Sequence, residues 1–280
     1  MKTSNHLLRR LTAALLAAVL ALSIALPVFA SDDGDTIYIN SVSDLLSLAK
    51  NCAYDQWSVG KTVILQKDLS LEGMLWEPIP SFSGQFKGNG HTISDLTITG
   101  QYSPAGLFGI VEEQGSIESL SVRGIVSVSD SADTTTGGIV GINHGTLINC
   151  QFTGVVTGDS EVGGIVGRNE SEGTIDHSTA RAIVTGKSST GGIAGYNLGA
   201  ITGCTNVGSI NTEYQEASLD TDGFTAKMVD QINNKMAAAD DDATNSVTNV
   251  ATDTGGIAGR SSGMILTSVN TGTVGYEHIG

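Results

Sequence analysis

The stretch GGIVGINHGTLINCQFTGVVTG, from Gly137 to Gly158, decides the fold of this chain because related copies of it recur. The copies are GGIVGRNESEGTIDHSTARAIVTG from Gly163, GGIAGYNLGAITGCTNVGSI from Gly191, GGIAGRSSGMILTSVNTGTV from Gly255 and a degenerate GLFGIVEEQGSIESLSVRGIVSV from Gly106. A self-similar unit of this length is typical of a solenoid, in which each coil buries its apolar residues against its neighbours.

Within one copy, GGIVG, GTLINC and GVVTG read as three short strands separated by Gly and Asn turns, where positive φ is tolerated. Counted from the second glycine of each pair, with Gly106 for the degenerate copy, the copies begin at residues 106, 138, 164, 192 and 256, and the shorter steps suit a three-sided coil. Stacking then places equivalent residues in columns about 4.8 Å apart. Three inward aliphatic ladders are predicted: Leu107, Ile139, Ile165, Ile193 and Ile257; Ile117, Leu147, Ile175, Ile201 and Ile265; Val126, Val156, Val184, Ile210 and Val274.

One polar column accompanies these ladders. It contains Asn143, Asn169 and Asn197, followed by Ser261. Stacked asparagines can hydrogen-bond along the column while their backbones tolerate left-handed turns, so we interpret the column as structural. Binding of a ligand by these amides is the alternative.

The residues before the repeats carry a family resemblance. KDLSL, then WEPIPSFSGQFKGNGHTISDLTITG and AGLFG, resemble the opening segment of GLUG-motif proteins, and the GGIVG and GGIAG copies resemble their tandem repeats. The resemblance extends from about Thr36 to Gly280, with a gap between Glu213 and Val250. It implies a right-handed parallel β-helix in an exported bacterial surface protein, and it carries over no catalytic residue.

The N-terminal 30 residues are predicted to be a signal peptide. Basic residues precede an apolar run from Leu11 to Leu26, and a cleavage site typical of exported proteins ends at Ala30. An uncleaved membrane anchor is the alternative. After cleavage we expect no membrane insertion and a secreted or cell-surface location.

The rest of the chain divides into two parts. Residues 31–60 are predicted to form a strand and an amphipathic helix that caps the first coil, because apolar residues from Val42 to Cys52 recur at helical spacing. Residues 61–280 are predicted to form the coils of the β-helix. A helix-bearing insertion at 213–250 interrupts them, where Phe224, Met228, Ile232 and Met236 form a helical stripe that we expect to pack on the solenoid or to bind a partner.

The net charge of the chain limits its possible binding partners. The chain carries 14 Lys and Arg against 29 Asp and Glu, and loss of the three basic residues before Ala30 changes the formal charge to 11 − 29 = −18. Nucleic acid is therefore excluded as a partner.

Cys150 and Cys204 share a column with Ser178 on the coil between them, so we predict two free, buried thiols.

The sequence offers few candidates for chemistry. Acidic runs at 31–35, 219–223 and 240–242 suggest calcium, but they lack a complete calcium-binding loop and are read as solvated loops. Asp176 and His177 are neighbours expected on opposite faces of a strand. We therefore predict no catalytic, cofactor-binding or metal-binding residue. Arg168, Tyr196 and Arg260 share a column and are the weak candidates for ligand binding, with solvated stacking as the alternative.

The sequence thus predicts an all-β, three-sided, right-handed parallel β-helix without a cofactor and without enzyme activity. It is expected to serve as a structural stalk, adhesin segment or interaction scaffold that contacts a host or cell-wall glycan or protein. The alternative is a carbohydrate-active β-helix, either a polysaccharide hydrolase or lyase or a glycan-binding module. We further expect the chain to be incomplete at its C-terminus, or that end to associate with another chain end to end.

Overall fold

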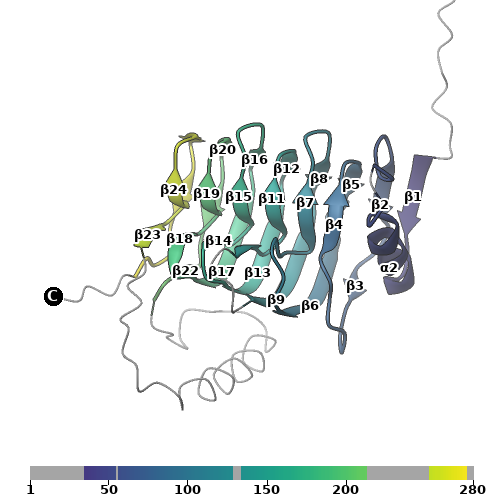
Figure 1. Ribbon diagram of the computed structural model, residues 1–280, viewed down its shortest axis with the longest axis horizontal. Helices are drawn as coiled ribbons and strands as arrows, with labels where there is room; N and C mark the ends of the chain where they lie inside the picture. The colour runs from purple at the N-terminus through teal and green to yellow at the C-terminus, as the bar shows by residue number, and fades with distance from the viewer. Residues whose placement is uncertain (1–34, 55, 129–133, 213–251, 276–280) are drawn as a thin grey trace, which may run out of the picture. The chain divides into compact units, whose positions relative to one another are not determined.

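The computed structural model is a stack of coils in which neighbouring strands run parallel (Figure 1). It describes residues 35–54, 56–128, 134–212 and 252–275, and those from Thr36 onward belong to one compact unit. This confirms the predicted parallel β-solenoid. The predicted signal peptide with its cleavage site at Ala30, and the insertion 213–250, lie outside the described residues.

Two eight-stranded sheets, here called A and B, run along the stack. Sheet A consists in spatial order of β1 (Thr36–Ile39), β2 (Thr62–Leu65), β5 (Gln85–Lys87), β8 (Ser116–Glu118), β12 (Thr146–Ile148), β16 (Thr174–Asp176), β20 (Ala200–Thr202) and β25 (Met264–Leu266). Sheet B consists of β3 (Leu69–Ser70), β6 (Thr92–Gly100), β9 (Ser121–Val128), β13 (Gln151–Thr157), β17 (Thr179–Thr185), β21 (Thr205–Asn206) and β26 (Val269–Asn270), with β22 (Ser209–Ile210) also paired to β17.

Two smaller sheets, C and D, complete each repeated coil. Sheet C consists of β4 (Ile79–Phe82), β7 (Phe108–Val111), β11 (Val140–Asn143), β15 (Val166–Asn169), β19 (Ala194–Asn197) and β24 (Ala258–Ser261). Sheet D consists of β10 (Thr135–Gly137), β14 (Glu161–Gly163), β18 (Ser188–Gly191) and β23 (Thr252–Gly255). Sequence reasoning expected three strands in each coil, and sheet D is the fourth.

The glycine pairs lie where the chain passes from sheet D to sheet C. A Cβ on Gly137 would lie 2.1 Å from the carbonyl oxygen of Val140, and a Cβ on Gly163 would lie 1.9 Å from that of Val166. Neither glycine has a positive φ. The pair is therefore required by close backbone approach rather than by a left-handed turn.

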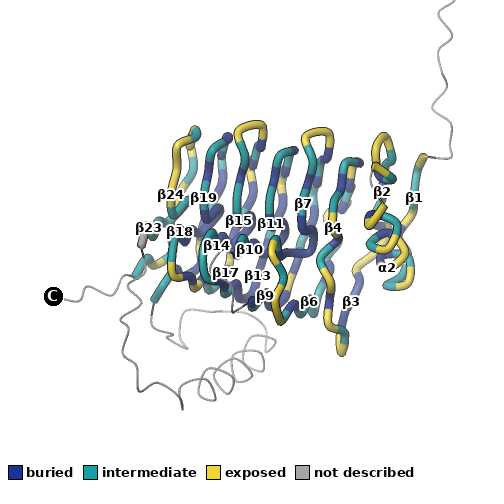
Figure 2. Tube along the Cα trace, in the orientation of Figure 1, coloured by how far each residue is buried: buried dark blue, intermediate teal, exposed yellow. Residues whose placement is uncertain are grey.

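Two of the three predicted ladders, those that begin at Ile117 and Val126, are confirmed by the strand register. Ile117, Leu147 and Ile175 pair in sequence within sheet A, and Val126 pairs with Val156 in sheet B. All five of these side chains are fully buried. Figure 2 shows buried positions concentrated in the middle coils, whereas exposed positions gather at the turns and on the last coil.

The asparagine column is a buried hydrogen-bonded ladder. The Nδ2 of Asn143 donates to Oδ1 of Asn169 at 2.7 Å, and the Nδ2 of Asn169 donates to Oδ1 of Asn197 at 2.8 Å. Asn197 in turn donates to Oγ of Ser261 at 3.1 Å. The three asparagines have no solvent exposure and lie in strands without positive φ. The structural interpretation is supported, and none of the three residues uses the left-handed conformation that asparagine tolerates.

The predicted N-terminal helix is α2 (Val42–Asn51). Ser41 caps it by accepting a hydrogen bond from the Asp44 amide, and the Asp44 carboxylate accepts one from the Asn40 amide. Leu45 and Leu48 are its buried residues. The helix packs against β1 and β4, which are the first strands of sheets A and C. It therefore lies at the N-terminal end of the stack, as a capping helix should.

Candidate functional site

The three weak ligand-binding candidates form a row along the outside of sheet C. Arg168 of β15 pairs with Tyr196 of β19, which pairs with Arg260 of β24. The Arg168 guanidinium carbon lies 5.0 Å from the Tyr196 ring centroid, and that of Arg260 lies 5.4 Å from it. The phenol ring thus contacts a guanidinium on each side, as the sequence predicted.

Two glutamates hold one end of this row. Arg168 Nε donates to Glu170 Oε1 at 2.6 Å, and Nη1 donates to Glu161 Oε1 at 2.7 Å. Burial by itself would lower the pKa of the Arg168 guanidinium. The hydrogen bond to Glu170 and the charge of Glu161 outweigh that effect, so the pKa is raised. Arg168 therefore stays protonated, and the two glutamates balance its charge. Its guanidinium lies against the Tyr196 ring.

The other end of the row is open. Arg260 is exposed, and no described carboxylate forms an ion pair with it. Its guanidinium can therefore donate paired hydrogen bonds to a planar oxyanion such as a carboxylate, beside an aromatic ring that can stack on a sugar. Sequence reasoning found the row but missed Glu161. Asp253 precedes Arg260 by the same interval as Glu161 precedes Arg168, but Asp253 and Arg260 form no ion pair, so this spacing by itself does not indicate one.

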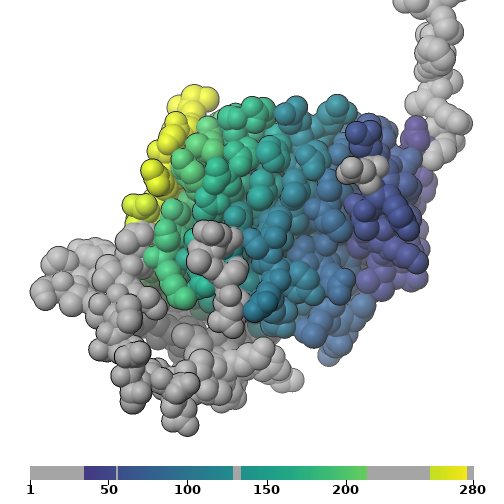
Figure 3. Space-filling view, viewed as in Figure 1, coloured from purple at the N-terminus to yellow at the C-terminus, as the bar shows by residue number. Residues whose placement is uncertain are grey.

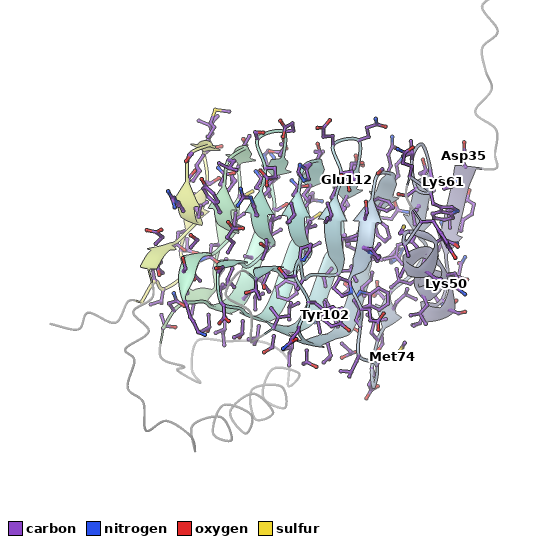
Figure 4. All side chains as sticks on the ribbon, viewed as in Figure 1. Asp35, Lys50, Lys61, Met74, Tyr102 and Glu112 are labelled. Carbon is purple, nitrogen blue, oxygen red and sulfur yellow. The ribbon has the colours of Figure 1, made fainter. Side chains whose placement is uncertain are left out.

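The column after the asparagine ladder is also charged. His144 and Glu170 directly follow successive strands of sheet C, and their amides donate hydrogen bonds to the carbonyl groups of Val111 and Asn143. Glu112, labelled in Figure 4, precedes them and accepts a 2.7 Å hydrogen bond from Ser81 Oγ. These side chains lie along one edge of the coils. Glu112 is already hydrogen-bonded to Ser81, and Glu170 to Arg168.

Asp176 and His177 do not point apart, contrary to expectation. Strand β16 ends at Asp176, and His177 occupies the following turn with a φ of 47°. That backbone brings His177 Nδ1 within 2.8 Å of Asp176 Oδ1. The strand rule failed because it does not extend into a left-handed turn residue. The pair lies on an exposed corner, away from the Arg168 row.

The cysteines occupy the predicted register. Ser178 lies between them in the column: its Oγ accepts a hydrogen bond from the Cys150 amide, and its amide donates to Cys204 Sγ. Cys150 and Cys204 are free and buried, as predicted. Burial raises the pKa of the Cys150 thiol to about 12 and that of Cys204 to about 11. Such thiols are poor nucleophiles and poor metal ligands.

Other possible sites are sparse in the described part of the chain. No group of three His, Cys, Asp or Glu side chains gathers there to hold a metal ion, and most of the acidic runs considered for calcium lie outside it. A shallow depression at the corner between sheets A and B is lined by Lys87, Asn89, Gly90, Glu118, Ser119 and Asn149. Among the described residues, no helix is long and apolar enough to cross a membrane.

One whole coil of this chain matches a known protein family. The family described as the GLUG motif matches residues 158–185, which contain β14, β15, β16 and β17, one strand from each sheet. The chain therefore contains a GLUG motif, and it folds as a parallel β-solenoid. The resemblance noted in the sequence is therefore confirmed.

Two relatives share part of this sequence. Halomucin of Haloquadratum walsbyi is 31% identical over 155 residues, which cover 51% of this chain and 2% of halomucin. A protein of Evansella cellulosilytica, provisionally named a Gly-rich membrane protein, is 29% identical over 137 residues, which cover 35% of this chain and 16% of that protein. The chain thus spans only a small part of either relative.

A solved structure shares the fold. It was described provisionally as an immunoglobulin A1 protease of Bacteroides ovatus, and it superimposes with a TM-score of 0.60 over 87% of this chain and 68% of its own. Sequence identity is 18%, so the likeness concerns the fold alone.

Proposed function

We propose that this protein is a secreted or cell-surface solenoid that acts as a stalk, adhesin segment or interaction scaffold, without a cofactor and without enzyme activity. The outer face of sheet B carries the proposal. Three of its outward columns repeat polar or aliphatic side chains from coil to coil, and the fourth contains two exposed arginines: Gln151, Thr179 and Thr205; Ile125, Val155 and Ile183; Ser127, Thr157 and Thr185; Arg123, Thr153 and Arg181. Such a flat surface suits a spacer or a docking platform better than a cleft for cleavage.

The placement of carboxylates supports the same proposal. Polysaccharide hydrolases use a pair of carboxyl groups that flank the substrate bond. Glu161 and Glu170 are the two that converge on sheet C, and both are held by Arg168. A relative named for a membrane is consistent with display on the cell envelope.

Two measurements test the scaffold proposal. The purified protein, incubated with a panel of acidic and neutral polysaccharides, is expected to release no reducing or unsaturated ends above an unfolded control. Protease treatment of intact cells of the source organism is expected to remove the protein, because a surface solenoid is accessible from outside. Polysaccharide cleavage would replace the proposal with the enzyme alternative, and full protection in intact cells would remove the surface location.

Glycan binding is the second candidate, favoured by the Tyr196 ring and by the Arg260 guanidinium, which forms no ion pair with a described carboxylate. An acidic sugar would stack on the ring and place its carboxylate against Arg260. The matched variants are Tyr196→Ala and Tyr38→Ala, since Tyr38 is an exposed tyrosine at 54% on the first strand. On an array of acidic glycans, Tyr196→Ala is expected to lose binding that Tyr38→Ala retains. Equal retention by both variants would exclude the Tyr196 row as the site.

A further inference from the structure

Two exposed arginines share a column on the outer face of sheet B. Arg123 of β9 and Arg181 of β17 both pair in register with Thr153 of β13, so they lie two coils apart, about 9 to 10 Å along the stack. Their strand neighbours Val122 and Ala180 are buried in the core, and the two arginines point outward. Figure 3 shows successive coils as adjoining bands of colour. The two guanidinium groups therefore belong to one surface that crosses three coils.

Neither of these arginines forms an ion pair with a carboxylate of the described residues. Asp68 lies close enough for its charge to interact with that of Arg123. However, Asp68 Oδ1 already accepts a hydrogen bond from the Thr92 amide at 2.9 Å and lies 3.2 Å from His91 Nδ1. Both guanidinium groups thus keep their donors for a ligand.

The surface around the arginine column favours an anion. The chain has a net charge of −15, yet no Asp or Glu occurs in strands β9, β13, β17, β21, β22 and β26 of sheet B. The column on one side of the arginines, here called the polar column, offers the hydroxyl and amide groups of Ser121, Gln151 and Thr179. On the other side, Ile125 and Val155 are only 6% and 4% exposed, so they offer little apolar contact. The face therefore suits an anionic ligand that is held by polar contacts.

The side chains of this face select among polyanions. Single-stranded nucleic acid is usually bound by stacking its bases on aromatic side chains, and Phe152, the one aromatic residue in β9, β13 and β17, is buried. Anionic membranes are bound by clusters of about four to eight basic residues, far more than this face carries. A linear polysaccharide with carboxylates at regular intervals can contact both arginines at once, while its hydroxyl groups bond to the polar column.

We propose that the outer face of sheet B binds a linear acidic polysaccharide that lies along the stack. Arg123 and Arg181 each donate paired hydrogen bonds to the carboxylate of a uronic acid, and Thr153 lies beneath the sugar between them. The polar column binds sugar hydroxyl groups. This inference rests on the scaffold proposal, for which it names the partner of the flat face, and it uses a different surface from the Tyr196 row.

Binding of the purified secreted protein to immobilised hyaluronan and alginate tests the proposal, with neutral dextran as the reference. The wild type is expected to bind at least one of the two acidic polysaccharides, more weakly as salt rises, and not to bind dextran. Arg123→Gln and Arg181→Gln should each weaken binding about two- to fivefold, and the double variant about tenfold. Lys50→Gln is the matched control, because it removes an exposed positive charge on α2, and it should bind as the wild type does. All three side chains are exposed, so circular dichroism should show an unchanged fold.

Four outcomes would overturn the proposal. The first two are a wild type that binds neither acidic polysaccharide and a double variant that binds as well as the wild type. The third is equal weakening by Lys50→Gln, which indicates a general effect of charge. The fourth is tighter arginine-dependent binding to single-stranded DNA or to vesicles of phosphatidylserine and phosphatidylcholine, which indicates another polyanion. None of them decides the scaffold proposal, which the cleavage and protease-accessibility measurements test separately.

Discussion

The opening coils and the repeated coils share one stacked architecture but have cores of different composition. In the opening coils, three phenylalanine rings, Phe82, Phe86 and Phe108, pack with centroids 5.4 to 6.3 Å apart. Trp76 lies buried nearby and donates its indole N–H to the Leu107 carbonyl. The repeated coils use aliphatic ladders and a column of buried amides instead. Bulky rings fill irregular space, whereas columns need identical residues at identical positions.

The boundary between the two cores is marked by one buried atom without a hydrogen-bond partner, Asn143 Oδ1. Each amide of the asparagine ladder donates toward the C-terminal end of the stack, so the first Oδ1, on Asn143, receives no donor from the ladder. Its predecessor in the column is Val111, and Asn143 Oδ1 is buried without a hydrogen bond. The unpaired oxygen at the start of the ladder lowers stability, and the ladder fixes the register only of the coils that follow it.

Truncation of a ring should have the largest effect. Phe86→Ala removes the side chain that contacts both other rings and leaves a cavity in a fully buried position. The expected loss in free energy of unfolding is about 3–5 kcal/mol. Urea titration followed by circular dichroism measures it, with Phe86→Leu as the milder control. A loss below about 1 kcal/mol would mean that the rings are not the core of the opening coils.

Breaking the amide ladder in its middle should cost less. Asn169→Leu leaves Asn197 Oδ1 without its ladder donor and removes the acceptor of Asn143 Nδ2. We expect a loss of about 2–3 kcal/mol. Asn143→Leu is the matched control, with a smaller loss because it also removes the unpaired Oδ1. The same titration separates the two, and equal losses would contradict a directional ladder.

The sequence was sufficient where a column repeats. The ladders beginning at Ile117 and Val126, the asparagine column and the Arg168 row were all found from spacing, because equal positions in equal coils must stack. The ring cluster was not found, since Phe82, Phe86 and Phe108 share no period. A second amide pair, in which Asn206 donates to Asn270 at 2.7 Å, was also missed because only two copies carry it.

The strands of sheet D were missed for a related reason. Their sequences, TTG, EVG, SSTG and TDTG, carry no inward aliphatic column that could mark them. Within the candidate site, Glu161 lies on one of these strands, so its approach to Arg168 could not be foreseen. Side-chain partners that come from an unrecognised strand are beyond pattern reasoning even when the coil itself is recognised.

The buried thiol in the repeated coils should make stability fall at alkaline pH. A folded pKa of about 12 for Cys150 lies above the unfolded value of about 8.5, so the folded state holds the proton more tightly. Its contribution is complete below about pH 8.5 and is lost as pH rises to about 12. Compared with Cys150→Ala, the wild type should lose about 2 kcal/mol more between about pH 8 and about pH 10. Parallel pH profiles would argue against a buried neutral thiol.

The smallest effect is expected on the outside of the repeated coils, where the comparison with the opening coils extends to the surface. The column that holds Arg168, Tyr196 and Arg260 begins with Ser81, Ile110 and Ile142, so the cation–aromatic row belongs to the repeats alone.

A double-mutant cycle on Tyr196→Ala and Arg260→Ala isolates the exposed half of this row, because Arg168 keeps Glu161 and Glu170 in every variant. An exposed cation–aromatic pair contributes about 0.5–1 kcal/mol, and the coupling measured by urea titration should lie at the lower limit of that range. Tyr196→Phe should preserve the coupling, since the ring face rather than the hydroxyl makes the contact. A coupling of zero would show that Arg260 contributes nothing to stability through the ring.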